Sequence, residues 1–153
     1  TTVGLEDVAA SWGRPVIDLL GADVGDDADA IYERRRVAAI WPAMGSEIEV
    51  GATIPAETGL VVETVDRTKG CYPGQELVER MDSRGASGPR QLRRFETENL
   101  GGDVAVGMPI IDPASDPDAD PVGTVTSVAG EFALGYVRRG AELGVGASDL
   151  SNA

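Results

Sequence analysis

The sequence predicts an α+β fold, and three stretches carry this prediction. An acidic run with helical spacing follows residue 25, a second amphipathic stretch follows Pro73, and strand-like runs begin at Gln91. Helical patterns therefore come first and strands follow, as in α+β proteins. We expect a small mixed α/β domain that carries the second helix, followed by a C-terminal antiparallel domain resembling a β-barrel.

The first strong helix signal lies in "GADVGDDADAIYERRRVAAIW". Acidic residues open it and arginines follow, which suits the helix dipole, while Ile31, Arg35 and Ala38 recur at helical spacing before Pro42. Because the arginines at 34–36 point in different directions around a helix, we expect surface ion pairs and not one ligand site. A helix-like piece is expected at 5–13, and short extended pieces at 45–60.

Four strand-like runs follow Gln91, separated by Gly, Pro and Asp: "RQLRRFETE", "VGMPIID", "VGTVTSVAG" and "EFALGYVRR". Their spacing predicts a small antiparallel sheet or barrel. The acidic run "DPASDPDADP" (112–121) lacks the glycine and final Glu of an EF-hand loop, so we expect a hairpin tip and no metal site. We place a domain boundary near residue 87, which divides 1–87 from 88–140, and expect a disordered tail at 141–153.

The net charge of the chain limits the kinds of molecule that it can bind. The chain has 153 residues, 26 of them acidic and 13 basic, for a net charge of −13. Such a field repels polyanions, so we expect no direct nucleic-acid binding. A merely soluble acidic surface and a halophilic adaptation both remain open. No apolar run is long enough for a membrane span, the start lacks the features of a signal peptide, and one cysteine forbids an internal disulfide. We therefore expect a cytoplasmic protein.

The only lysine and the only cysteine of the chain, Lys69 and Cys71, lie two positions apart in "RTKGCYPGQELVER". Pro73 suits the first turn of a helix, which places Cys71 one or two residues ahead of unpaired backbone N–H groups. That position, together with Lys69 and Arg67, favours a thiolate. The competing interpretation is a buried cysteine that acts as a small hydrophobic residue. Histidine is absent, which excludes Ser–His and Cys–His pairs within this chain.

The stretch "KGCYPGQELVER" resembles the K-G-C-Y-x-G-Q-E signature of the YgfZ-type folate-binding proteins, which are relatives of the glycine-cleavage T-protein, an aminomethyltransferase. Every fixed position of the signature is matched: Lys69, Gly70, Cys71, Tyr72, Gly74, Gln75 and Glu76, with Arg80, Arg84 and Gly85 also in place. T-proteins are similar here but carry K-x-F-x-G-R-E without the cysteine.

Two flanking elements are similar to the same family. "RRRVAAIWPAMGSEI" resembles R-x-E-A-G-x-P-x-x-G-x-D-I at Arg36, Ala39, Pro42, Gly45 and Ile48, and "IPAETGL" resembles P-x-E-x-G-L at Pro55, Glu57, Gly59 and Leu60. In the first element Ala38 stands where the family has an acidic residue, which contacts the pterin ring in the T-protein, and Ile40 stands where it has a glycine.

The resemblance implies a YgfZ-like folate-dependent auxiliary protein in iron–sulfur cluster assembly or maintenance and in the tRNA modification linked to it. Cys71 and Lys69 would then be the catalytic residues, tetrahydrofolate the cofactor, and iron–sulfur enzymes or assembly proteins the partners. Tyr72, Gly74, Gln75, Glu76 and Arg80 would bind the cofactor. Residues 1–87 would end the folate-binding domain, and 88–140 would form the C-terminal barrel. The alternatives are an aminomethyltransferase that transfers a one-carbon unit to tetrahydrofolate, and an acidic binding module with a structural cysteine.

Overall fold

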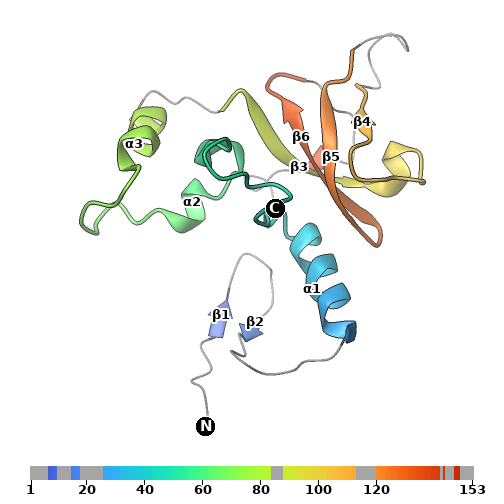
Figure 1. The fold of residues 1–153 in the computed structure, drawn as a ribbon, viewed down its shortest axis with the longest axis horizontal. Helices are drawn as coiled ribbons and strands as arrows, with labels where there is room; N and C mark the ends of the chain where they lie inside the picture. Colours follow the sequence, from blue (N-terminus) through green and yellow to red (C-terminus); the bar gives the residue numbers. More distant parts are fainter. Residues whose placement is uncertain are drawn as a thin grey trace.

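The computed structural model describes residues 7–9, 15–17, 26–83, 88–112, 120–141, 143 and 147–148. It confirms the α+β class: helices occupy the first part of the chain and an antiparallel sheet the second (Figure 1). The sheet is curled into a half-barrel. Helix α1 (Asp26–Ala38) lies against this sheet, and helix α3 (Gln75–Ser83) lies on the side of the molecule away from the sheet.

Helix α1, Asp26–Ala38, forms where helical spacing predicted it. It ends before Ile40, whose φ of 57° is left-handed and cannot continue a right-handed helix. Val37 and Ile40 are fully buried. They pack with a group of buried residues on the sheet, namely Leu92, Leu134 and Tyr136. The C-terminal end of α1 is therefore anchored in an apolar cluster.

The middle of the chain consists mainly of turns and short helices. Helix η1, Pro55–Glu57, is a single 3₁₀ turn, and α2, Val61–Thr64, is a four-residue helix. The expectation of short extended pieces at 45–60 is therefore wrong. The helix-like piece expected at 5–13 is also wrong where it is described, because β1, Asp7–Ala9, pairs with β2, Pro15–Ile17. Helix α3, Gln75–Ser83, follows the motif turn.

The sheet has the strand order β4-β5-β6-β3-β7. Its strands are β3 (Arg90–Glu96), β4 (Pro109–Ile110), β5 (Gly123–Ala129), β6 (Phe132–Arg138) and β7 (Ala147–Ser148). All four predicted runs contain a strand. Pairing of Ile110 with Gly123 is antiparallel, so residues 111–122 connect neighbouring strands, as a hairpin tip does. Residues 113–119 lie outside the described residues.

One face of the curled sheet holds a second apolar cluster, made of Phe95, Ile110, Val122, Val125, Ala133 and Val137. Ala141 and Leu143 pack against it. Both residues belong to the stretch in which we expected a tail, and so does β7, which pairs with β3. The other residues of that stretch lie outside the described residues.

Contacts connect the two sides of the predicted boundary near residue 87, although 84–87 themselves are not described. The buried carboxylate of Glu57 accepts a hydrogen bond from Arg90 Nε at 3.1 Å. A Cβ on Gly88 would lie 2.4 Å from Glu57 Cγ, so only glycine permits this approach. The start of β3 is thus fixed against η1.

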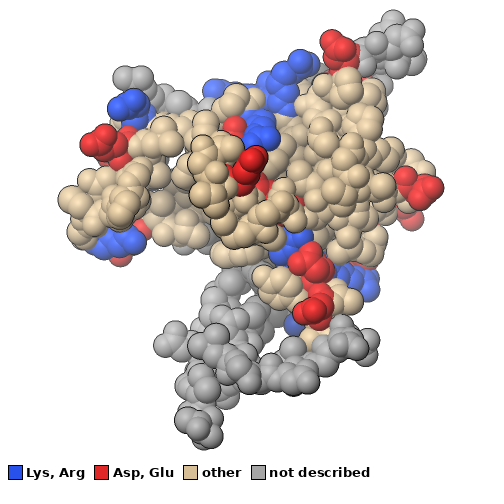
Figure 2. Space-filling view, in the orientation of Figure 1, with Lys and Arg blue, Asp and Glu red and all other residues tan. Residues whose placement is uncertain are grey.

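On the face shown in Figure 2, basic and acidic side chains lie beside one another over α3, over the centre of the molecule and along α1. The acidic excess of the sequence does not produce one continuous acidic surface on this face. Arg34 and Glu131 form one such exposed pair, with an N–O distance of 2.6 Å. The predicted surface ion pairing is confirmed for Arg34.

Candidate functional site

The signature stretch forms a tight turn that leads into α3. The Gln75 N–H donates to the Tyr72 carbonyl at 3.3 Å, and Gly74, between them, has a φ of 85°. Proline followed by a left-handed glycine at the centre of such a hydrogen-bonded turn is the pattern of a type II turn. Because a left-handed residue cannot belong to a right-handed helix, α3 begins at Gln75, later than the predicted start at Pro73.

The side chain of Gln75 closes this turn from the other side. Its Oε1 accepts the backbone N–H of Tyr72 at 3.2 Å. Tyr72 and Gln75 are thus joined by two hydrogen bonds, one through each backbone N–H. This pair holds the residue that follows Cys71, so Gln75 orients the turn.

Cys71 is exposed, which contradicts the interpretation of a buried hydrophobic cysteine. It lies four residues before Gln75, the first residue of α3, and not one or two as predicted. Lys69 lies on the other side of Gly70, with its Nζ 5.1 Å from the centre of the Tyr72 ring. That distance is within the range of a cation–π contact. The signature therefore presents a thiol, an ammonium group and an aromatic ring on one short loop.

The start of this loop is fixed by Asp66. Its Oδ1 accepts the Thr68 backbone N–H at 2.8 Å and the Thr68 hydroxyl at 2.7 Å. These hydrogen bonds, with smaller contributions from the backbone and charge of Lys69, lower the pKa of the Asp66 carboxyl below its usual value. An aspartate that bonds to the backbone two residues later favours a turn, which sets the path of the chain towards Lys69.

A cavity of about 430 Å³ lies between this loop and α3. Its volume falls within the range of small-molecule sites in proteins, roughly 300–1,000 Å³. Its lining consists of Val65, Asp66, Arg67, Lys69, Gly70, Tyr72, Gln75, Glu76, Val78 and Glu79. The loop supplies two cations and α3 supplies two carboxylates, so groups of both signs face one space.

The cavity brings together some of the predicted site residues and leaves out others. Lys69, Tyr72, Gln75 and Glu76 line it, whereas Cys71, Gly74 and Arg80 do not. Arg80 is exposed on the last turn of α3. The two matches that follow α3, at 84 and 85, lie outside the described residues.

Sequence reasoning missed Glu79, which lines the cavity three residues after Glu76. Residues three apart on a helix lie on the same face. That spacing was a signal that could have found it.

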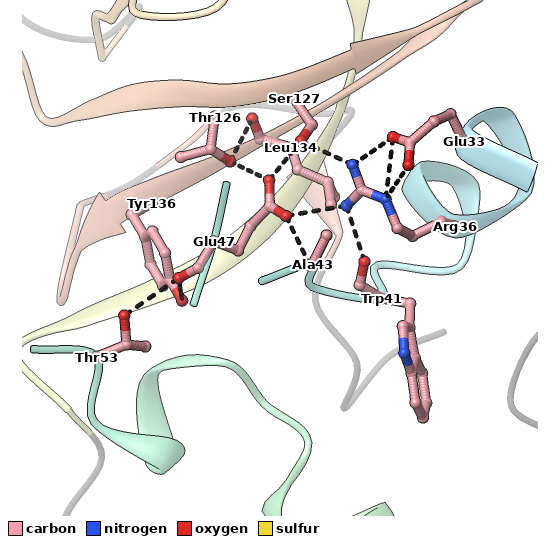
Figure 3. A network of polar contacts seen from close by, with 10 residues as sticks. All are labelled: Glu33, Arg36, Trp41, Ala43, Glu47, Thr53, Thr126, Ser127, Leu134 and Tyr136. Atoms are coloured by element: carbon pink, nitrogen blue, oxygen red, sulfur yellow. Dashed lines mark hydrogen bonds and ion pairs between the residues drawn. The ribbon is translucent and has the colours of Figure 1, made fainter. Parts of the chain in front are cut away.

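A second polar cluster lies between α1 and the sheet and is buried (Figure 3). Arg36 is 1% exposed and Glu47 is 2% exposed, and they pair at 2.9 Å. The other Glu47 oxygen accepts the hydroxyl groups of Thr126 at 2.7 Å and Ser127 at 2.6 Å. The cluster therefore joins α1, the loop after it and β5.

Every N–H of the Arg36 guanidinium has an acceptor in this cluster. Besides Glu47 these are Glu33, the Trp41 carbonyl and the Ser127 hydroxyl. Burial alone would lower the pKa of Arg36, but hydrogen bonds and charge attraction from Glu33 and Glu47 outweigh it and raise that pKa above its usual value. The surface role expected for Arg36 is therefore wrong, because its side chain is buried. Its partners lie up to 91 positions away in the sequence, so the local pattern does not reveal them.

Tyr136 completes the cluster from β6. Its hydroxyl donates to the Glu47 carbonyl at 3.0 Å, and burial raises the pKa of Tyr136 to about 12. Among the described residues, no buried side-chain nitrogen or oxygen lacks a hydrogen-bond partner. A cluster with all its groups satisfied stabilises the fold and offers no group to a ligand.

Position 38 does not fit the folate contact that the family resemblance implies. A pterin ring presents an amino group and a ring N–H, which a carboxylate accepts and a methyl group cannot. The side chain here is the methyl of Ala38, and its backbone carbonyl already accepts a hydrogen bond from Arg94. Glu47, the buried acid nearby in sequence, is bonded to protein groups through both oxygens.

Comparison with known proteins does not assign this chain. No protein-family model matches it, and no curated protein matches it. Among the described residues, no group of three or more Cys, Asp or Glu side chains is arranged to hold a metal ion. No helix in the described part of the chain combines the length and apolar character that crossing a membrane requires.

Proposed function

We propose that this chain belongs to a YgfZ-like auxiliary protein for iron–sulfur enzymes and the tRNA modification that depends on them, with Cys71 as the working thiol. One observation carries the proposal: the thiol of a fully matched signature is exposed, directly before a turn that the signature's own residues build. The glycine at 74 permits the turn, and Gln75 closes it.

The backbone at the other family elements supports the resemblance. Gly45 and Gly59, both matched, have left-handed φ angles of 86° and 79°. Ile40 stands where the family has glycine and also has a positive φ, 57°. Left-handed geometry is what selects glycine, so the family's glycine pattern agrees with the conformation of this chain.

The acidic positions of those elements agree as well. The aspartate position of R-x-E-A-G-x-P-x-x-G-x-D-I falls on Glu47, which pairs with the matched Arg36 inside the protein. Glu57, the matched acid of P-x-E-x-G-L, is 3% exposed, and its Oε2 lies 3.4 Å from the backbone N–H of Ile54, as an acceptor. The family patterns thus correspond to buried contacts that support the fold.

The finer architecture follows from the same proposal. The part before residue 87 would close a folate-binding domain of the T-protein type, and 88–140 would form the C-terminal barrel. The partners would be iron–sulfur enzymes or assembly proteins in the cytoplasm. One thiolate cannot hold a cluster alone, since clusters need about four ligands. As a cluster ligand, Cys71 would therefore share the cluster with a partner. The other roles open to it are those of a redox thiol and of a nucleophile.

Tetrahydrofolate is the cofactor that the resemblance implies, and one-carbon transfer is the chemistry that it supplies when bound. Because Ala38 cannot make the family's pterin contact, the residues of this chain do not fit folate held in the family's manner. Cys71 and Lys69 are the groups of this chain that we assign to the chemistry. Tyr72, Gly74, Gln75 and Glu76 shape the loop and the cavity beside them.

The decisive experiment is complementation in cells that lack the native gene. The Cys71→Ser variant should fail to restore the activity of an iron–sulfur enzyme, whereas the control Ser83→Ala, at the end of α3, should restore it. Full rescue by the serine variant, at equal protein level, would reject a working thiol.

An activity assay distinguishes the aminomethyltransferase alternative from this proposal. It requires glycine-dependent one-carbon transfer to tetrahydrofolate by the purified protein, and that activity should persist in Cys71→Ser because T-proteins lack the cysteine. The binding-module alternative required a structural cysteine that is buried, which the exposed Cys71 contradicts.

A further inference from the structure

The cavity beside the signature turn has two oppositely charged walls. Lys69 and Arg67, both on the loop, line one part of it, and Glu76 and Glu79 line the part formed by α3. Asp66 also lines the cavity from the loop, and Thr68 holds its carboxylate by two hydrogen bonds. The charges on α3 that line the cavity are those of Glu76 and Glu79.

Some acids in the described part of the chain are paired with an arginine, whereas the two glutamates of the cavity are not. Glu33, Glu47, Glu57 and Glu131 each form an ion pair with an arginine. Within the described residues, no ion pair involves Glu76 or Glu79. Their spacing of three residues places both carboxylates over the same face of α3, towards the cavity that both line.

On the loop, Lys69 is held in place by an aromatic contact, and within the described residues it forms no ion pair. Its Nζ lies over the ring of Tyr72, a contact that orients an ammonium group and leaves its positive charge intact. A carboxylate that enters the cavity would meet this charge. Val65 and Val78 add apolar surface to the lining.

We infer that this cavity binds a small zwitterion, with its carboxylate at Lys69 and its ammonium group at Glu76 and Glu79. A polyanion would be repelled by the two glutamates, and a simple cation would leave the charge of Lys69 without a counter-charge. A molecule that carries both charges is attracted by each wall. An amino acid and a short peptide share this chemistry. The inference concerns the site of the proposed function but does not require the thiol of Cys71.

Amide NMR spectra of the protein can test this inference directly. Titration with leucylglycine should shift the amide signals of residues 65–79 in a saturable way. N-acetyl-leucylglycine, which lacks the ammonium group, and leucylglycinamide, which lacks the carboxylate, should each bind about two- to fivefold more weakly, as expected for solvent-exposed ion pairs. Free leucine shows which kind of zwitterion the cavity binds. An affinity comparable to that of leucylglycine indicates an amino-acid site, and a weaker affinity indicates a peptide site.

Variants assign each end of the ligand. The double variant Glu76→Gln and Glu79→Gln should bind leucylglycine no more tightly than its N-acetyl form. It should still bind leucylglycine more tightly than leucylglycinamide. Lys69→Gln should do the reverse, and Glu98→Gln, an exposed acid on η2 (Thr97–Leu100), should change neither. The absence of saturable shifts, or equal affinity for all three dipeptides, would overturn the inference.

The test also separates this inference from the proposed function. Cys71→Ser should still bind leucylglycine as tightly as the parent protein. Binding by this variant together with full rescue in cells would reject the working thiol and keep the zwitterion site. Failed rescue with no dipeptide binding by the parent protein would reject the site and keep the thiol.

Discussion

The guanidinium of Arg36 and the carboxylate of Glu47 form an ion pair at 2.9 Å inside the protein, with side chains that are 2% and 0% exposed. The pair joins the end of α1 to the loop that follows it, and Ser127 connects both residues to β5. Burying two charges costs desolvation energy, which their attraction and their other hydrogen bonds offset. Removing one partner should therefore lower the free energy of unfolding by more than the pair contributes to it, because the other charge stays buried without its partner.

Replacing Glu47 by Gln should destabilise the protein by about 3 kcal/mol, the lower end of the range for a broken buried pair, because Glu33 still binds Arg36. Urea unfolding measures this change. The matched control is Glu49→Gln, an exposed position two residues away, which should change the free energy of unfolding by less than about 0.5 kcal/mol. Equal unfolding midpoints for Glu47→Gln and the parent protein would contradict a stabilising role for the cluster.

Gly74→Ala should destabilise the signature turn by about 1 to 2 kcal/mol, the cost of a left-handed conformation for a residue with a Cβ. No atom lies within 4 Å of the added Cβ, so the cost comes from the backbone conformation and not from a clash. Gly70→Ala is the control: its surroundings are equally open and its φ is not left-handed. Thermal unfolding of both variants checks the prediction, and equal losses would show that the turn differs from the one described.

The lowered pKa of Asp66 predicts a pH-dependent contribution to stability. Its folded-state pKa lies below the unfolded value of 3.8. The stability it contributes is therefore present above pH 3.8 and is lost as the pH falls through the folded-state pKa. Thr68→Ala removes the hydroxyl donor, so the Asp66 pKa should rise towards 3.8 in an NMR titration. An unchanged pKa in this variant would show that the hydroxyl does not stabilise the carboxylate.

Ala38→Glu should strengthen tetrahydrofolate binding about tenfold or more, since a hydrogen bond to a charged group contributes about 1.5 to 3 kcal/mol. Fluorescence titration of the protein with tetrahydrofolate measures the effect. Ala39→Glu adds the same charge at the next position and should leave the affinity unchanged. Equal affinities for the parent protein and Ala38→Glu would mean that this position makes no pterin contact.

The net charge of −13 predicts that salt stabilises the fold. In molar KCl the Debye length is about 3 Å, so repulsion among surface carboxylates is screened. The melting temperature should therefore rise between low salt and molar KCl. Sorbitol at matched osmolality controls for general exclusion of solutes from the protein surface. A melting temperature that falls with KCl would reject halophilic adaptation.

The elements that were predicted correctly are those with a local pattern. The runs that contain β3, β5 and β6 carry strand-like sequences bounded by Gly, Pro and Asp, and α1 has helical spacing with charges that suit its dipole. The start of α3 was placed too early because Pro73 suits both a first helical turn and the second position of a type II turn. The left-handed φ of Gly74 selects the type II turn. A glycine permits this angle but does not require it, so the sequence alone does not decide.

The errors at 45–60 and at Arg36 have a different origin. The loop that contains Glu47 takes its shape from contacts with Thr126, Ser127 and Tyr136, which lie about 80 to 90 positions further on. Nothing local in the sequence reveals such partners. The cavity at α3 could be predicted only in part, since the signature gives Lys69, Tyr72, Gln75 and Glu76 but not Glu79.

Lys69 carries the only side-chain amine of the chain, and it lies within two residues of the only thiol. A thiol-selective reagent can therefore place one reporter group on this loop without any substitution. An environment-sensitive dye on Cys71 would change its emission when a partner protein covers the loop.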